Sequence, residues 1–103
     1  MLFHIAERER WAQAVASASG VYTPEAYVAD GFVHLSSHDQ VVRTAQRWYA
    51  GRTDVVLLVL DDDALGDAVR WEPGSLGEAE LFPHCYAPLP LTAVLEVRDH
   101  LVP

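Results

Sequence analysis

Three short segments of the chain, read as strands, place two apolar residues on one face and one or two polar residues on the other, a pattern typical of strands that turn one face to a core. They lie at residues 2–6, 32–36 and 68–72. Residues 55–60 read VVLLVL without a polar interruption, as expected for a central strand covered on both faces. Further strands are predicted over residues 81–86 and 92–98.

Two other segments carry the spacing of amphipathic helices. The first covers residues 7–18 and should end before Gly20; its apolar positions are Trp11, Ala14, Val15 and Ala18. The second begins with Ser37 and Gln40, a capping box in which each side chain satisfies the backbone N–H of the other residue. This helix should end near Gly51 and bury Val41, Val42, Ala45, Trp48 and Tyr49.

The chain of 103 residues shows no internal repeat and no low-complexity segment, so we expect a single domain over residues 1–103. Strands outnumber helices and do not alternate regularly with them. This order predicts an α+β fold rather than a doubly wound parallel sheet.

The net charge of −8 and the pI near 4.8 argue against nucleic acid as a partner, because such domains usually present a basic stripe. The seven basic residues are all arginines, scattered from Arg8 to Arg98. The same charge disfavours an anionic membrane surface, and no apolar run approaches the ~20 residues of a membrane span. The single cysteine, Cys85, excludes an internal disulfide, so a cytoplasmic protein is expected. The oligomeric state is left open.

Three histidines occur in one predicted setting. His4, His34 and His84 each lie on a short strand, on the face opposite an apolar one. Arg70 and Glu72 share a face of another predicted strand in the same way. If these faces converge, they line one polar cleft over an otherwise apolar sheet.

The segment DGFVHLSSHDQV gives His34 a candidate role in ligand binding. Val33 and Leu35 already supply the apolar face, and burying an imidazole costs free energy unless both nitrogens find partners. Ser36 shares the face of His34, and the helix that follows offers free backbone amides to an anion. The alternative is a satisfied structural histidine, and for His4 this alternative is the stronger one.

Three histidines could also hold zinc and leave a position open for water, which would make the chain a metal-dependent hydrolase. No local spacing such as HExxH supports that site, so no metal is expected. Cys85 points to the opposite side of its strand from His84 and cannot form a nucleophilic dyad with it. The three aspartates at residues 61–63 are more typical of a solvated turn than of a divalent-ion site.

Carboxylate candidates occur in two places. Glu78 and Glu80 form a Glu-x-Glu pattern that occurs in some ADP-ribosyl-transferring enzymes, although an acidic chain produces it easily. Glu72, beside Trp71 on a predicted strand, is at least as good a candidate. No glycine-rich phosphate-binding loop is present.

The segments FHIA, DGFVHLSS, VLLVLD, VRWEP and LFPHCYAPLPL together resemble a family of small bacterial proteins, domain of unknown function 952. The resemblance covers nearly the whole chain, in the same order. The sequence departs from the family pattern at Cys85 and Ala87, where leucine and glycine are expected. These departures concern local packing more than the site.

That family resembles a compact form of the ADP-ribosyltransferase fold, which implies small antiparallel sheets with two main helices around an NAD-binding cleft. The resemblance implies that His4 grips the NAD ribose from the first strand, that His34 and Ser36 form the second-strand element, and that Glu72 or Glu80 supplies a carboxylate. The catalytic candidates are therefore His34, Glu72 and Glu80. The ligand-binding candidates are His4, Ser36, Arg70, His84 and Tyr86.

Cleavage of the nicotinamide–ribose bond builds positive charge on the sugar, which a nearby carboxylate stabilises without a metal. An aromatic ring, from Tyr22, Tyr27 or Tyr86, would stack on nicotinamide. We therefore expect a protein that binds NAD or a related nucleotide and acts as an ADP-ribosyltransferase-like or NAD-glycohydrolase-like enzyme. The alternatives are a non-catalytic module that binds a nucleotide or another small anion, and the metal-dependent hydrolase.

Overall fold

A three-stranded antiparallel sheet forms the centre of the computed structural model, which describes residues 1–74, 77 and 79–102. Its strands, in spatial order, are β1 (Leu2–Glu7), β4 (Val55–Leu60) and β8 (Val94–Arg98). The central strand β4 is the VVLLVL segment, and each of its residues is buried. The predicted central strand, covered on both faces, is confirmed.

A second three-stranded antiparallel sheet is joined to β1. Its strands, in spatial order, are β3 (Val33–His34), β6 (Leu81–Cys85) and β5 (Val69–Pro73). A bridge between Phe3 and Ser36 connects the two sheets through a pair of 2.8 Å backbone hydrogen bonds. A separate antiparallel pair consists of β2 (Val21–Tyr22) and β7 (Leu89–Pro90).

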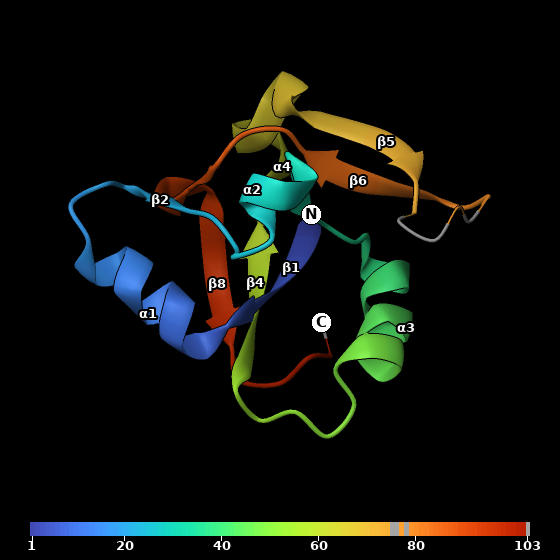
Figure 1. The fold of residues 1–103 in the computed structure, drawn as a ribbon, viewed down its shortest axis with the longest axis horizontal. Coiled ribbons are helices and arrows are strands. Elements are labelled where there is room, and N and C mark those ends of the chain that lie inside the picture. Colours follow the sequence, from blue (N-terminus) through green and yellow to red (C-terminus); the bar gives the residue numbers. More distant parts are fainter. Residues whose placement is uncertain (75–76, 78, 103) are drawn as a thin grey trace.

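Two main helices, α1 and α3, flank the central sheet on opposite sides (Figure 1). The helix α1 (Arg8–Ala16) follows β1 directly, and α3 (His38–Trp48) follows the bridge at Ser36. Short helical turns connect the strands: α2 (Tyr27–Asp30), α4 (Asp62–Leu65), η1 (Gly66–Ala68) and η2 (Leu91–Ala93). Gly31 ends α2 with a φ of 79°, and this left-handed conformation, which glycine adopts readily, redirects the chain into β3.

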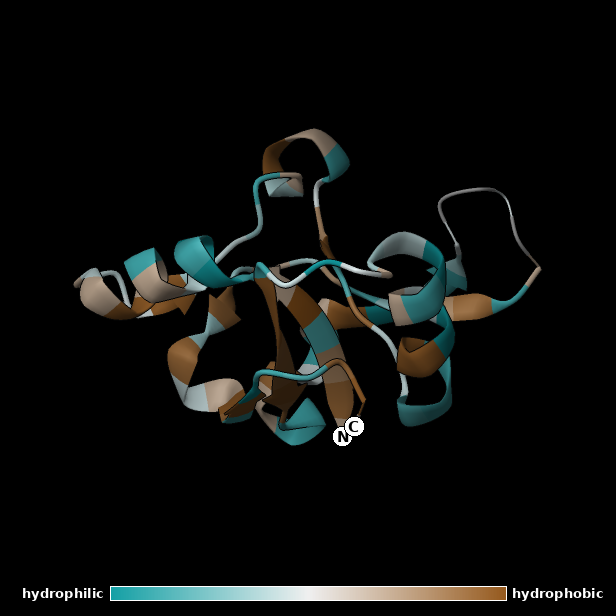
Figure 2. Cartoon of the chain, turned by 90° about the horizontal axis from the view of Figure 1, so that it is seen from below, coloured by the Kyte–Doolittle hydropathy of each residue, from teal (hydrophilic) through white to brown (hydrophobic). Residues whose placement is uncertain are grey.

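The core is divided between the two faces of the central sheet. Leu2 and Ala6 of β1 belong to the hydrophobic cluster on one face, and Phe3 and Ile5 belong to the cluster on the other. The second cluster also contains Val41 of α3. In Figure 2 the brown, hydrophobic residues concentrate in the central strands, whereas the helices carry much of the teal, hydrophilic surface.

The predicted capping box at the start of α3 is confirmed. Ser37 Oγ accepts the Gln40 backbone N–H at 3.3 Å, and Gln40 Oε1 accepts the Ser37 backbone N–H at 3.0 Å. The prediction that Trp48 is buried is wrong, because its side chain is 56% exposed. The helix meets the sheet through a stripe with four-residue spacing, and Trp48 lies at the edge of that stripe, which consists of Val41, Ala45 and Tyr49.

The first helix and the strand of His34 are shorter than predicted. The helix α1 ends at Ala16, and Val15 is 55% exposed instead of packing inward. The strand β3 has two residues, because Ser36 pairs with Phe3 of the central sheet. The elements β2, β7 and α2 were not predicted, since segments of two to four residues are too short to show a period.

The predicted α+β class, with small antiparallel sheets and two main helices, is confirmed by this arrangement. No helix within residues 1–74, 77 and 79–102 is long and apolar enough to cross a membrane. The second sheet and α3 together border the region where several of the predicted site residues lie.

Candidate functional site

A cleft of about 370 Å³ lies between α3, the edge of β1 and the second sheet. Its lining combines aromatic and aliphatic side chains with imidazole, hydroxyl and guanidinium groups, contributed by Phe3, His4, Ile5, His34, Leu35, Ser36, Gln40, Arg43, Thr44, Arg47, Trp48, Tyr49, Gly74, Phe82 and His84. Small-molecule pockets occupy ~300–1,000 Å³. The cleft is therefore large enough for one small ligand.

Strand register places the polar residues of the second sheet on one face. His34 pairs directly with His84, which pairs with Arg70 on its other side. Directly paired residues of antiparallel strands point to the same face. Val33 and Cys85 face the opposite side and belong to the hydrophobic cluster. The predicted convergence of His34 and His84 is confirmed, and both line the cleft together with His4 and Ser36.

His34 is held by the carboxylate of Asp30. The His34 Nε2 atom lies 2.8 Å from Asp30 Oδ2, and the side chain of His34 is 42% exposed. The His34 ring lies 5.5 Å from the His84 ring, measured between centroids, in an edge-on arrangement. Among the described residues, His34 Nδ1 has no hydrogen-bond partner.

His84 is held by a second carboxylate and is almost fully buried. Its Nδ1 lies 3.0 Å from Glu72 Oε1, and the ring of Phe32 stacks on its imidazole with 4.0 Å between centroids. Nε2 of His84 has no hydrogen bond to any described residue. Every fully buried side-chain nitrogen or oxygen in the described chain has a partner, so this Nε2 must be accessible to solvent. His84 is also one of the residues that line the cleft.

Ser36 is bonded to the protein through its backbone alone. Its N–H and C=O pair with Phe3, whereas its hydroxyl has no partner among the described residues. The residue is only 6% exposed and lines the cleft. Because every fully buried side-chain nitrogen or oxygen in the described chain has a partner, Ser36 Oγ is accessible to solvent.

Glu72 does not line the cleft, contrary to the prediction that it or Arg70 forms part of the wall. The Glu72 carboxylate accepts hydrogen bonds from Tyr86 Oη and from His84 Nδ1, and these bonds lower its pKa. The guanidinium of Arg70 lies 5.1 Å from the centre of the Tyr86 ring. Arg70 and Tyr86, like Glu72, are not among the lining residues.

His4 lines the cleft, but its ring nitrogens are both engaged within the protein. Nδ1 lies 2.7 Å from the backbone oxygen of His34, and Nε2 lies 3.4 Å from Tyr22 Oη. Burial lowers the pKa of His4 from 6.5 to about 4. Both nitrogens are engaged as in a satisfied core histidine, and this geometry favours a structural role for His4. Ligand binding by its imidazole stays a prediction.

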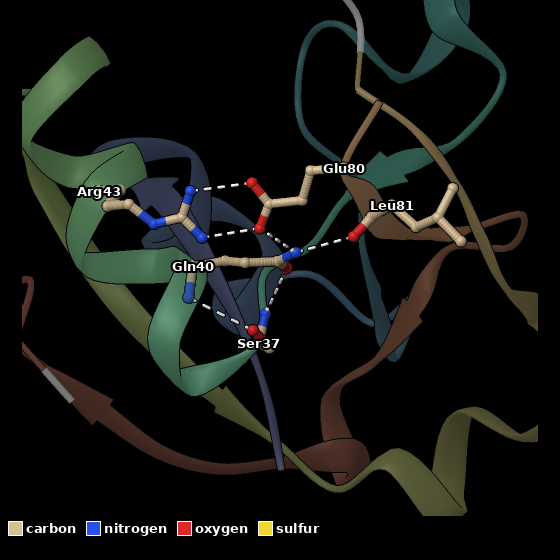
Figure 3. Close-up of polar contacts among 5 residues, drawn as sticks. All are labelled: Ser37, Gln40, Arg43, Glu80 and Leu81. Atoms are coloured by element: carbon tan, nitrogen blue, oxygen red, sulfur yellow. Dashed lines mark hydrogen bonds and ion pairs between the residues drawn. The ribbon is translucent and has the colours of Figure 1, made fainter. Parts of the chain in front are cut away.

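Glu80, the second carboxylate candidate, anchors the start of β6 to α3 (Figure 3). Its oxygens accept two bonds from Arg43, at 2.8 and 2.7 Å, and one from Gln40 Nε2 at 3.0 Å. The bond from Arg43 is the main reason why the pKa of Glu80 falls to about 2. Gln40 also donates to the Leu81 carbonyl at 2.7 Å. Glu78, the other member of the predicted Glu-x-Glu pair, lies outside the described residues.

The described lining of the cleft contains arginine and histidine but neither aspartate nor glutamate. Arg43 and Arg47 contribute two of the chain's seven positive residues to this one surface. Neither residue was selected from the sequence. The lining positions of α3 follow the three- and four-residue spacing of one helix face, but the sequence does not show that the second sheet lies beside that face. These positions are Gln40, Arg43, Thr44, Arg47 and Trp48.

Metal binding and cysteine chemistry find no support in the geometry. Within the described part of the chain, no group of three or more His, Cys, Asp or Glu side chains could hold a metal ion. Cys85 is buried, its thiol donates to the Ala87 carbonyl at 3.4 Å, and burial raises its pKa. A buried thiol with a raised pKa is a poor nucleophile.

The family model described as protein of unknown function (DUF952) matches residues 5–97, and the chain belongs to this family. The chain is similar to protein CC0527 from Caulobacter crescentus. The crystal structure of that protein is 34% identical, with a TM-score of 0.80 over 93% of this chain and 82% of that chain. Its solution NMR structure is 35% identical, with a TM-score of 0.79 over 95% of this chain and 82% of that chain. No curated protein matches the sequence.

Proposed function

We propose that this protein binds a nucleotide, NAD or a related one, in the cleft beside α3. The observation that carries the proposal is the set of donor groups in the lining: two arginines and three histidines line the cleft without a carboxylate among the described lining residues, although Glu80 forms an ion pair with Arg43 from outside that lining. Guanidinium groups gathered on one surface attract an anionic ligand, in a chain whose net charge is −8. Arginine is also the residue best suited to a phosphate, because its planar group donates two parallel hydrogen bonds.

The remaining lining suits the other parts of a nucleotide. Phe82 and Trp48 offer aromatic faces to a base. Ser36 Oγ and His84 Nε2 have no partner among the described residues and are placed to bond ribose hydroxyls or phosphate oxygens. The cleft lies near the lower end of the usual volume range, so we assign it to one nucleotide unit, with the rest of a dinucleotide in solvent.

Binding is better supported than cleavage of the nicotinamide–ribose bond. That reaction calls for a carboxylate beside the ribose. Glu72 is turned to His84 and Tyr86, and Glu80 is held by Arg43 and Gln40. Kinship with the ADP-ribosyltransferase fold remains part of the proposal, supported by the paired small sheets and by the position of Ser36 ahead of α3. We place the protein in the cytoplasm, in keeping with its single cysteine.

Calorimetric titration with NAD, AMP and adenosine tests this function. We expect NAD and AMP to bind and adenosine, which lacks phosphate, to bind at least about tenfold more weakly, a loss of ~1.4 kcal/mol. Arg47→Gln should weaken AMP binding by a similar factor and leave adenosine unchanged. Arg98→Gln, which alters an arginine of β8 away from the cleft lining, is the matched control. Equal binding of AMP by wild type and Arg47→Gln, or no binding of either phosphate ligand, would refute the proposal.

A further inference from the structure

Two imidazoles in the cleft are each oriented by a carboxylate outside it. Asp30 holds His34 through Nε2, and Glu72 holds His84 through Nδ1. Neither carboxylate is a lining residue. A carboxylate in this position fixes the imidazole ring and balances the charge that develops when the ring takes up a proton during a reaction. The chain therefore contains two such pairs side by side.

Each of the two neighbouring imidazoles has a second nitrogen that no described residue bonds. His34 and His84 are cross-strand partners with centroids 5.5 Å apart, and both line the cleft. His34 Nδ1 and His84 Nε2 have no partner within the described chain. A histidine kept only for packing beside Phe32 would not need a carboxylate, and two of them would not need to face one cavity.

The surroundings select the kind of reaction. Transfer at phosphorus requires a base for the attacking hydroxyl, an acid for the leaving oxygen and cations for the charge on the phosphoryl oxygens. Two imidazoles and the guanidinium groups of Arg43 and Arg47 line the same cleft. Attack on a ribose carbon requires a carboxylate there, which the described lining lacks.

We propose that His34 and His84 act as a general base and general acid pair that hydrolyses a phosphodiester of a bound nucleotide. One imidazole accepts a proton from water as the water oxygen bonds to phosphorus. The other donates a proton to the ester oxygen as its bond to phosphorus breaks. The products are a phosphomonoester and an alcohol, and proton exchange with solvent resets both rings. Asp30 and Glu72 are positioning residues. This inference rests on the proposed nucleotide binding.

The substrate class follows from the need for an acid. A phosphodiester with an alkoxide leaving group requires protonation, whereas a nitrophenolate leaves without it. Adenosine 2′,3′-cyclic phosphate is therefore the probe for the full pair, and it matches the single nucleotide unit assigned to the cleft. Bis(4-nitrophenyl) phosphate is the probe for the base alone.

The experiment measures hydrolysis of both probes by wild type, His34→Ala and His84→Ala, with His100→Ala as the control, because His100 is exposed and lies outside the cleft lining. We expect wild type to hydrolyse the cyclic phosphate and each of the two cleft variants to lose about a hundredfold or more. The variant that lacks the acid should lose much less on the nitrophenyl ester, and added imidazole should restore part of the lost rate.

If His84→Ala fails to fold, Glu72→Gln replaces it in the experiment, because glutamine keeps the shape of glutamate. This variant should lower kcat and leave KM for the cyclic phosphate unchanged. AMP binding by calorimetry separates the two proposals. If the wild-type protein binds AMP but does not hydrolyse the cyclic phosphate, the proposed acid–base pair is wrong and the proposed nucleotide binding stands. Failure to bind AMP overturns both. Hydrolysis that survives in folded His34→Ala, or that imidazole does not restore in either variant, also overturns the pair.

Discussion

His4 donates a hydrogen bond from Nδ1 to the backbone carbonyl of His34, with 2.7 Å between nitrogen and oxygen. This bond fixes the tautomer, so Nε2 is the acceptor that faces Tyr22 Oη. The histidine of the first strand thus secures the strand that carries a histidine of the cleft. Its imidazole must stay neutral to remain in the core, because burial lowers its pKa to about 4.

The buried His4 makes stability depend on pH in mildly acidic solution. Below pH 6.5 the unfolded chain binds a proton at this residue, whereas the folded protein binds it only near pH 4. Stability therefore falls as the pH is lowered through this window, by about 2 kcal/mol between pH 7 and pH 5. Urea unfolding at the two pH values measures the loss. The variant His4→Gln should be less stable at pH 7, but its free energy of unfolding should change less between the two pH values. An equal change in the variant and in wild type would contradict the lowered pKa of His4.

Ser37→Ala should destabilise the fold by ~1 kcal/mol, because the first turn of α3 loses the acceptor for the Gln40 N–H. Chemical denaturation of both proteins gives the difference. Gln46→Ala, at an exposed position of the same helix, is the control and should change stability by less than ~0.5 kcal/mol. Equal midpoints for Ser37→Ala and wild type would show that the cap contributes nothing.

Glu80→Gln tests whether the Glu80 carboxylate competes with a bound anion for Arg43. The glutamate neutralises Arg43, so its replacement should raise the positive potential of the cleft and tighten AMP binding severalfold. The calorimetric titration used above measures this change, and Glu96→Gln, which removes a carboxylate of β8, controls for the net charge. Weaker AMP binding in Glu80→Gln than in Glu96→Gln would mean that Glu80 organises the cleft instead of competing with the ligand.

The sequence predicts the elements whose pattern is strong and the residues whose strand register follows from it. Residues 55–60 become the central strand and Ser37 caps α3, because an apolar run and a capping box are local signals. His34 and His84 share a cleft because period-two alternation places both opposite the core. His4 obeys the same alternation, yet both faces of its strand are buried, so the polar face predicted for it is core.

The rest depends on packing that a pattern does not encode. Trp48 is exposed because α3 approaches the sheet through the neighbouring stripe of side chains. Arg43 and Arg47 become lining residues only once α3 lies across the second sheet. Glu72 was expected to face a ligand, but its oxygens are taken by His84 and Tyr86. In each case a contact between distant segments decides the role.

The most direct test of the central claim is an amide NMR titration of the 15N-labelled protein with AMP. Nucleotide binding in the cleft predicts saturable shift changes in the amides of His34, Ser36, Arg43, Arg47 and His84, whereas those of the exposed α1 positions stay constant. Adenosine at the same concentration should produce much smaller changes at the two arginines. No saturable change at any of these residues, or changes centred on α1, would contradict the assignment of this cleft as a nucleotide site.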